Sequence, residues 1–76
     1  MSIDVSIPAF GMGMTEGRLA EWLVADGTRV AAGDPIYSIE SDKSVQEVEA
    51  PGDGVIEILM AADETYPVGT LIARIA

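Results

Sequence analysis

The sequence predicts an all-β domain, a small barrel or sandwich built from two similar halves. Three observations support this fold class: short runs with the composition of strands, turn-forming residues at close spacing between them, and an internal repeat. The chain has 76 residues, a length that suits one domain, so we expect residues 1–76 to form a single unit.

Six runs have the alternation of apolar and polar residues, or the β-branched composition, that is typical of strands. They are residues 3–8, 18–24, 35–40, 44–50, 54–60 and 70–75. Turn-forming residues separate them, at Gly11 and Gly13, Asp26-Gly27, Gly33-Asp34-Pro35, Pro51 to Gly54, and Pro67 to Gly69. The run 18–24 (RLAEWLV) also suits a helical turn. We expect a strand, because Gly17 and Asp26-Gly27 bracket too few residues for a stable helix.

The second half of the chain repeats the first, since residues 17–39 align with residues 54–75. The matched pairs are Gly17 with Gly54, Leu19 with Ile56, Asp26 with Asp63, Thr28 with Thr65 and, after one deletion, Gly33 with Gly69, Ile36 with Ile72 and Ile39 with Ile75. Upstream, Ile7-Pro8 matches Ala50-Pro51. One copy is too small to bury its own apolar face. We therefore expect the two halves to close on each other with pseudo-two-fold symmetry.

Two segments break the repeat. The first is IESDKSV, residues 39–45, which joins the halves and whose counterparts are the chain ends, so we expect a hairpin with Asp42 and Lys43 at its tip. Lys43 is the only lysine of the chain. The second is AFGMGMTE, residues 9–16. Eight residues separate Pro8 from Gly17, but two separate Pro51 from Gly54, so the first half carries six more.

The composition excludes several classes of function. Thirteen acidic residues against four basic ones give a net charge of −9, which argues against nucleic acid or membrane partners and favours basic protein surfaces. The chain has no cysteine and no histidine, so we predict neither a metal site nor a catalytic residue. The start of the chain lacks the features of a signal peptide, and no apolar run approaches the ~20 residues of a membrane span.

Several stretches together resemble the lipoyl domain of the dihydrolipoamide acyltransferase component of 2-oxo acid dehydrogenase complexes. They are GMTEG (13–17), the spacing from Asp26-Gly27 to Gly33, IESDKS (39–44) and VEAPGDGVI (48–56). The resemblance covers essentially the whole chain. It implies a flattened barrel of two small antiparallel sheets, with Lys43 at an exposed hairpin tip and lipoic acid in amide linkage to its Nζ atom.

The chemistry of the hairpin suits such a carrier. An exposed tip admits large partners, and a strand on each side provides a rigid base, so that mobility resides in the arm. Asp42 and Lys43 both suit the central positions of a type I turn. Because the chain has a single lysine, a modifying enzyme meets no competing lysine on this domain. We interpret Asp42, Ser44 and Glu40 as residues that lipoylating enzymes recognise.

The extra residues 9–16 are interpreted as a partner-recognition loop, since a barrel of two equivalent halves does not need them. Phe10, Met12 and Met14 offer apolar contacts and Glu16 offers charge. The alternative is that Phe10 and the methionines cap an open end of the barrel.

The resemblance also implies partners and a compartment. The partners are lipoylating enzymes, a thiamine-diphosphate-dependent dehydrogenase, the acyltransferase core and dihydrolipoamide dehydrogenase. The domain itself is expected to be a monomeric, non-catalytic carrier, since the acyltransferase core of the family uses a histidine. The stretch GMTEG resembles loops of pyruvate- and acetoin-type complexes. We expect a cytoplasmic location in a bacterium, or the mitochondrial matrix in a eukaryote.

Three alternatives share this fold. A biotinyl carrier domain typically has methionine on both sides of its lysine, whereas Lys43 lies between Asp42 and Ser44. The lipoylated glycine-cleavage carrier is usually longer, with helical additions. The third alternative is an unmodified module of an adaptor or assembly protein, which the mass of the expressed protein would distinguish.

Overall fold

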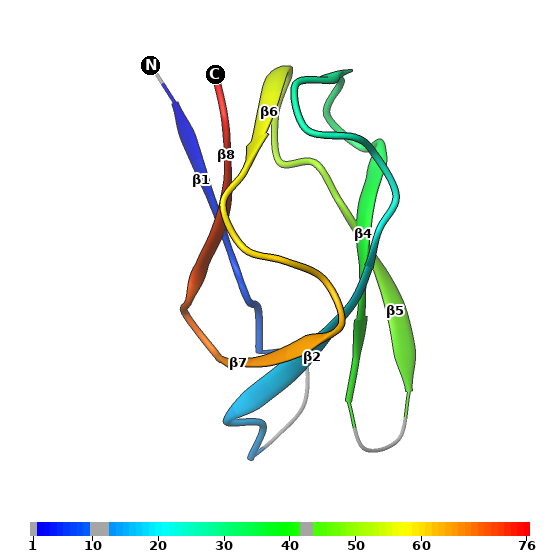
Figure 1. The fold of residues 1–76 in the computed structure, drawn as a ribbon, viewed down its shortest axis with the longest axis vertical. Coiled ribbons are helices and arrows are strands. Elements are labelled where there is room, and N and C mark those ends of the chain that lie inside the picture. Colours follow the sequence, from blue (N-terminus) through cyan, green and yellow to red (C-terminus); the bar gives the residue numbers. More distant parts are fainter. Residues whose placement is uncertain (1, 10–12, 42–43) are drawn as a thin grey trace.

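The computed structural model describes residues 2–9, 13–41 and 44–76, and in this part of the chain all regular structure is β (Figure 1). The strands are β1 (Ile3–Ser6), β2 (Glu16–Trp22), β3 (Arg29–Val30), β4 (Pro35–Glu40), β5 (Val45–Glu49), β6 (Gly54–Ile58), β7 (Glu64–Pro67) and β8 (Leu71–Ile75). They form two four-stranded antiparallel sheets, with strand orders β1-β8-β6-β3 and β5-β4-β2-β7. The predicted all-β barrel-sandwich is therefore confirmed.

All six predicted strands are present, with ends that differ by a few residues. The run 18–24 forms strand β2 and not a helical turn. Strands β3 and β7 were not predicted. They have two and four residues, too few for a recognisable alternation of apolar and polar residues. Each is defined by pairing with the first residues of a strand remote in sequence: β3 pairs with β6, and β7 pairs with β2.

The two sheets are copies of each other under the pseudo-two-fold operation. Exchanging β1 with β5, β8 with β4, β6 with β2 and β3 with β7 converts one strand order into the other. Hydrogen bonds between the halves repeat as well: Gly33 N–H donates to the Ala50 carbonyl at 3.0 Å, and Gly69 N–H donates to the Ile7 carbonyl at 2.9 Å. Gly33 and Gly69 share a φ of +92°, a conformation that favours glycine. The predicted symmetry is confirmed.

The sequence alignment of the repeat is wrong by one residue in its middle. In the structure Gly27 (φ +85°) corresponds to Asp63 (φ +68°), because their N–H groups donate to the equivalent carbonyls of Ile56 and Leu19. The extra residue of the first half therefore precedes Gly27. It coincides with a β-bulge in β2, where the register against β4 shifts between Leu19 and Glu21.

The core lies between the two sheets and is formed by aliphatic side chains from both halves together with one aromatic residue, Tyr37. Its fully buried larger members are Tyr37, Ile7, Leu19, Ile36, Ile39, Ile56, Ile72 and Ile75. Trp22 is half-buried against this core, and its indole Nε1 donates to the Met60 carbonyl at 3.0 Å, as expected for a tryptophan at the rim. Within the described residues, no helix is long and apolar enough to cross a bilayer.

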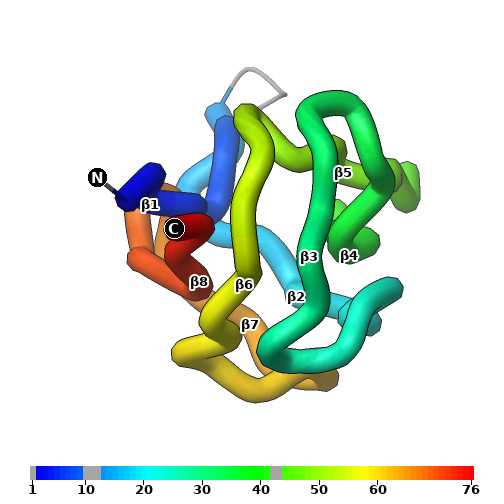
Figure 2. Tube along the Cα trace, turned by 90° about the horizontal axis from the view of Figure 1, so that it is seen from above, coloured from blue at the N-terminus to red at the C-terminus, as the bar shows by residue number. Residues whose placement is uncertain are grey.

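The chain ends and the β4–β5 hairpin lie at opposite ends of the molecule (Figure 1). β1 pairs with β8, with Ile3 opposite Ile75, so the two chain ends are neighbours, as the end-on view of Figure 2 also shows. The start of β2 lies at the same end as the hairpin (Figure 1). The fold thus isolates the only hairpin that joins the two halves from the chain ends.

Candidate functional site

The hairpin of β4 and β5 has a rigid base. β4 lies between β5 and β2 in its sheet, and its residues Ile36 to Ile39 are buried. The ladder between β4 and β5 runs to Glu40, which pairs with Val45. A strand that is held on both sides and buried along its length is a firm support for whatever its end carries.

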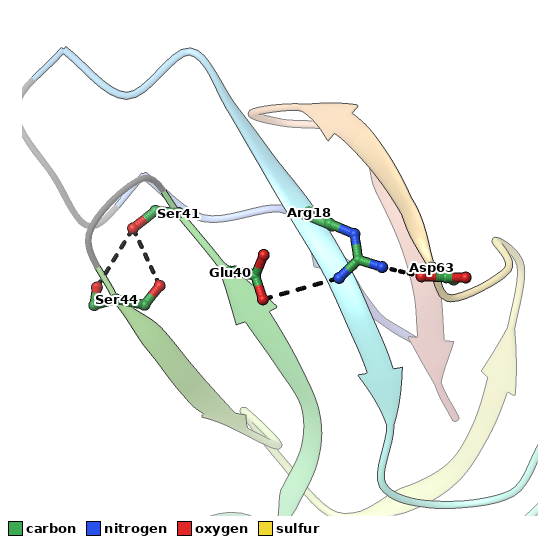
Figure 3. Close-up of polar contacts among 5 residues, drawn as sticks. All are labelled: Arg18, Glu40, Ser41, Ser44 and Asp63. Carbon is green, nitrogen blue, oxygen red and sulfur yellow. Dashed lines mark hydrogen bonds and ion pairs between the residues drawn. The ribbon is translucent and has the colours of Figure 1, made fainter.

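Ser41 and Ser44 close the end of this ladder (Figure 3). Ser41 N–H donates to the Ser44 carbonyl at 2.8 Å. Ser41 Oγ lies 3.3 Å from the same carbonyl oxygen and 3.4 Å from Ser44 Oγ. Asp42 and Lys43 lie outside the described residues, and so does the turn type predicted for them. In the sequence they are the two residues between Ser41 and Ser44, the pair that closes the ladder.

The surface beside the hairpin combines an apolar side chain with acidic ones. Val45 is 61% exposed, and Glu40 and Glu47 belong to the same pair of strands. Glu40 is half-buried as a residue, while Ser44 is exposed. Of the three predicted recognition residues, the structure therefore places Glu40 and Ser44 on either side of the hairpin tip, and Asp42 is outside the described part.

Arg18 and Asp63 are charged neighbours of the hairpin that the sequence analysis missed (Figure 3). Arg18 lies on β2, opposite Glu40 of β4 and Thr65 of β7. Its Nη1 atom is 3.9 Å from Glu40 Oε2, and its Nη2 atom forms a hydrogen-bonded ion pair with Asp63 Oδ1. One signal was present in the sequence: in the repeat Arg18 aligns with Val55, so it is a charge that one half carries and the other lacks.

The segment 9–16 contributes to the core as well as to the surface. Met14 is half-buried and packs against the core, and a Cβ at Gly17 would come within 2.9 Å of Met14 Cε and 2.6 Å of Ile39 Cδ1. Glu16 is exposed and begins β2, opposite Pro67. Phe10 and Met12 lie outside the described residues. The packing of Met14 supports the capping alternative for that residue, whereas the exposure of Glu16 suits a contact.

A groove of about 210 Å³ lies elsewhere, between β1 and β5, which are the edge strands of the two sheets. Its walls include the symmetry-related pairs Val5 with Val48 and Pro8 with Pro51, and Tyr37 lies beside them. Among the described residues, no group of three or more carboxylates is arranged to hold a metal ion. The groove therefore belongs to the two edge strands, and Glu40 and Val45, where the β4–β5 ladder ends, do not line it.

The comparisons with known proteins agree with this geometry. A family model described as "Biotin-requiring enzyme", which covers biotin and lipoyl attachment domains, matches residues 3–75. The chain is 44% identical, over its whole length, to the dihydrolipoyllysine-residue acetyltransferase component of the pyruvate dehydrogenase complex of Zymomonas mobilis. It is 43% identical, over 91% of its length, to the corresponding component of the acetoin cleaving system of Pseudomonas putida. It spans 18% and 19% of these relatives.

A solved structure shows the same fold. The lipoyl domain of the 2-oxoglutarate dehydrogenase complex from Azotobacter vinelandii superimposes with a TM-score of 0.80 at 36% identity, covering 97% of this chain and 95% of that one. The fold and the hairpin place the chain in the class of small β-domains to which lipoyl domains belong. The chain belongs to the biotin and lipoyl attachment family, and it is a lipoyl domain.

Proposed function

We propose that Lys43 carries lipoic acid in amide linkage and that residues 1–76 form one lipoyl domain acting as a swinging-arm carrier. The observation that carries this proposal is the place of the chain's only lysine in the sequence, three residues after the end of β4, which is buried from Ile36 to Ile39. It stands between Ser41 and Ser44, which close the ladder. A rigid base with a projecting tip lets a long arm reach active sites while the domain stays folded.

The residues present fit the group. Amide formation needs a side-chain amine, and Lys43 is the only residue that supplies one, because the other three basic residues are arginines. The serines that close the hairpin are small, so they leave access to the tip. When bound, the dithiolane supplies the acyl-transfer and redox chemistry, while the chain supplies attachment, presentation and recognition.

The relatives support a choice of partners. The pyruvate and acetoin systems named for them favour a carrier that serves a complex of this type, moving acyl groups and reducing equivalents between active sites. In such a complex a thiamine-diphosphate-dependent dehydrogenase, an acyltransferase core and dihydrolipoamide dehydrogenase act on the arm in turn. The domain would be part of an acyltransferase, or a free-standing partner to one, in the bacterial cytoplasm or the mitochondrial matrix. Its net charge of −9 suits basic docking surfaces on these enzymes.

Recognition is assigned to residues around the tip. Asp42, Ser44 and Glu40 would be read by the lipoylating enzymes, and Ser44 and Glu40 border the tip in the structure. Glu16, with Phe10 and Met12, would contact the dehydrogenase that acylates the arm, while Met14 also serves the core.

A biotinyl carrier is the second candidate, because the matching family includes both kinds of domain. The named relatives and the solved neighbour are lipoyl proteins, and the residues beside Lys43 are aspartate and serine and not methionine. These observations favour lipoate.

The mass of the intact protein tests the proposal. Expressed with a lipoylating enzyme and lipoate, the domain should gain one lipoyl group, and its net charge should move from −9 to −10 because the amide removes the lysine charge. Lys43→Gln should abolish the gain and change the free energy of unfolding by no more than about 0.5 kcal/mol. A lipoyl group on the Lys43→Gln protein, or biotin on the wild type, would overturn the assignment.

A further inference from the structure

Arg18 connects the base of the hairpin to the other half of the barrel. Its guanidinium reaches Glu40, the last residue of β4, with Nη1 and Asp63, in the turn between β6 and β7, with Nη2 (Figure 3). Nη2 therefore hydrogen-bonds one carboxylate, while Nη1 lies 3.9 Å from the other, which is an ion-pair distance and not a hydrogen bond. A guanidinium can do this because its donors are held in one plane at fixed angles, whereas an ammonium group is a single point of charge.

The backbone of Asp63 is fixed in a turn that is hydrogen-bonded to β2. Asp63 has a φ of +68°, and its N–H donates to the Leu19 carbonyl at 2.7 Å, next to Arg18 in the chain. The Asp63 side chain therefore extends from a backbone position that is hydrogen-bonded to β2, the strand of Arg18. Arg18 is held at one end by this turn, and it offers its remaining nitrogens to Glu40.

The symmetry of the fold shows that the sheets do not need this ion-pair bridge. The symmetry mates of Arg18 and Glu40 are Val55 and Ala76, which pair through backbone hydrogen bonds of 2.7 and 3.0 Å and carry no charged side chains. The same strand pairing is therefore built without such a bridge at the end of the molecule that holds the chain ends, where Arg74 of β8 pairs instead with Asp4 of β1. Among the described residues, the three-residue bridge is found only beside the β4–β5 hairpin.

The bridge is expected to contribute little to the free energy of unfolding. The side chains of Arg18, Glu40 and Asp63 are 38%, 45% and 77% exposed. Ion pairs between side chains as exposed as these contribute little to folding, because solvent screens them and because ordering the side chains costs entropy. A role in presenting Glu40 accounts for a bridge that is placed beside the hairpin and weak as a structural element.

We propose that Arg18 is a positioning residue for lipoylation: its fork, anchored on Asp63, holds the Glu40 carboxylate in the orientation that the lipoylating enzyme contacts. This inference rests on the proposed function, in which Lys43 is modified and Glu40 is recognised. Without Arg18, Glu40 must be ordered when the enzyme binds, and the cost of ordering a long side chain lowers the rate.

The test measures initial rates of lipoylation of the unmodified domain by a purified lipoate–protein ligase with lipoate and ATP. Arg18→Gln should lower kcat/KM about fivefold, the scale expected when one side chain must be ordered on binding. Arg18→Lys should be as slow as Arg18→Gln, since one ammonium group does not hold both carboxylates. Asp63→Asn should give a smaller loss and keep its turn, because asparagine tolerates positive φ.

Two further variants separate positioning from a general effect. Arg29→Gln removes the same charge from an exposed residue of β3 and should react at the wild-type rate, because Arg29 pairs with Val55, the neighbour of Ala76 at the end opposite the hairpin. The double variant Arg18→Gln/Glu40→Gln should be no slower than Glu40→Gln, because Arg18 acts only through Glu40. Circular dichroism and melting temperature should be unchanged throughout.

The outcomes distinguish the inference from the function beneath it. A wild-type domain that gains no lipoyl group at Lys43 would overturn the proposed function, and this inference with it. If the wild type is lipoylated but Arg18→Gln reacts equally fast, the positioning role of Arg18 is overturned, while the proposed function stands. Full activity of Arg18→Lys, or additive losses in the double variant, would also overturn it, since these results indicate a role of charge or an action independent of Glu40.

Discussion

Tyr37 on β4 and Trp22 on β2 are cross-strand neighbours whose ring centroids lie 5.3 Å apart, with their planes at 58°. Tilted aromatic pairs at this distance stabilise a core beyond the area that they bury. The polar ends of the two rings differ. The Trp22 indole donates to the Met60 carbonyl, but the hydroxyl of Tyr37 is buried with no hydrogen-bond partner among the described residues. The ring therefore stabilises the core while its hydroxyl costs free energy.

Replacing Tyr37 by phenylalanine should make the domain more stable. The ring pair and the buried area remain, while an unsatisfied hydroxyl, which costs about 1–3 kcal/mol, is removed. We expect the free energy of unfolding to rise by about 1 kcal/mol, which raises the melting temperature of a domain this small by about 4–8 °C. Thermal and urea unfolding measure both quantities.

Tyr66→Phe is the matched control for this prediction. The Tyr66 hydroxyl donates to the Ala61 carbonyl at 2.7 Å and lies 3.0 Å from Glu64 Oε2, so its removal should lower stability by about 0.5–1.5 kcal/mol. A Tyr37→Phe variant that is also less stable would show that water in the neighbouring groove satisfies the Tyr37 hydroxyl.

Alkaline pH should destabilise the domain through the same residue. Burial raises the pKa of Tyr37 to about 12, whereas an exposed tyrosine ionises near pH 10. Between these values the unfolded chain releases the proton and the folded chain retains it, so stability falls as pH rises from about 10 to about 12. The loss from this residue should be about 2 kcal/mol. Urea unfolding at pH 8 and pH 11.5 checks it, and Tyr37→Phe should show a smaller fall than the wild type.

The two roles of the segment 9–16 should separate residue by residue. Met14→Ala should lower the free energy of unfolding by about 1–2 kcal/mol, because half-buried apolar atoms that pack beside Gly17 and Ile39 are lost. Glu16→Gln should leave stability within about 0.5 kcal/mol, since its side chain is exposed. It should instead lower kcat/KM for reductive acylation of the lipoylated domain. Wild-type acylation of Glu16→Gln would remove that residue from the recognition loop.

The strand pattern and the repeat were sufficient to predict the fold class, because alternation and turn residues are local properties. Leu19, Ile36 and Ile39 matched Ile56, Ile72 and Ile75 in the alignment, and all six are buried. The alignment failed between Leu19 and Gly33, where similar letters placed Asp26 opposite Asp63 and Thr28 opposite Thr65. The structure absorbs the extra residue in a bulge of β2, and a bulge is defined by the pairing of two strands, which no single segment contains.

For the site, the sequence indicated which residue would carry an attached group, but it did not indicate which charged side chains lie beside the hairpin. Lys43 was singled out because it is the only lysine and lies where the repeat is joined. Arg18 was not singled out, since it lies 22 residues before Glu40 and 45 before Asp63, and only the pairing of β2 with β4 and β7 brings the three together. Met14 was interpreted as a contact residue, with capping of the barrel as the alternative, and it is half-buried, because the missing side chain of Gly17 leaves room for it.

The amino-acid sequence by itself determined the class of this domain, its two-fold design and the identity of its one amine-bearing side chain, since composition, periodicity and repetition are written along the chain. The tertiary structure decided which strands are edges, where the bulge lies, and which charges surround the hairpin. These features depend on contacts between residues far apart in the chain, and such contacts exist only once both sheets have formed and closed on a common core.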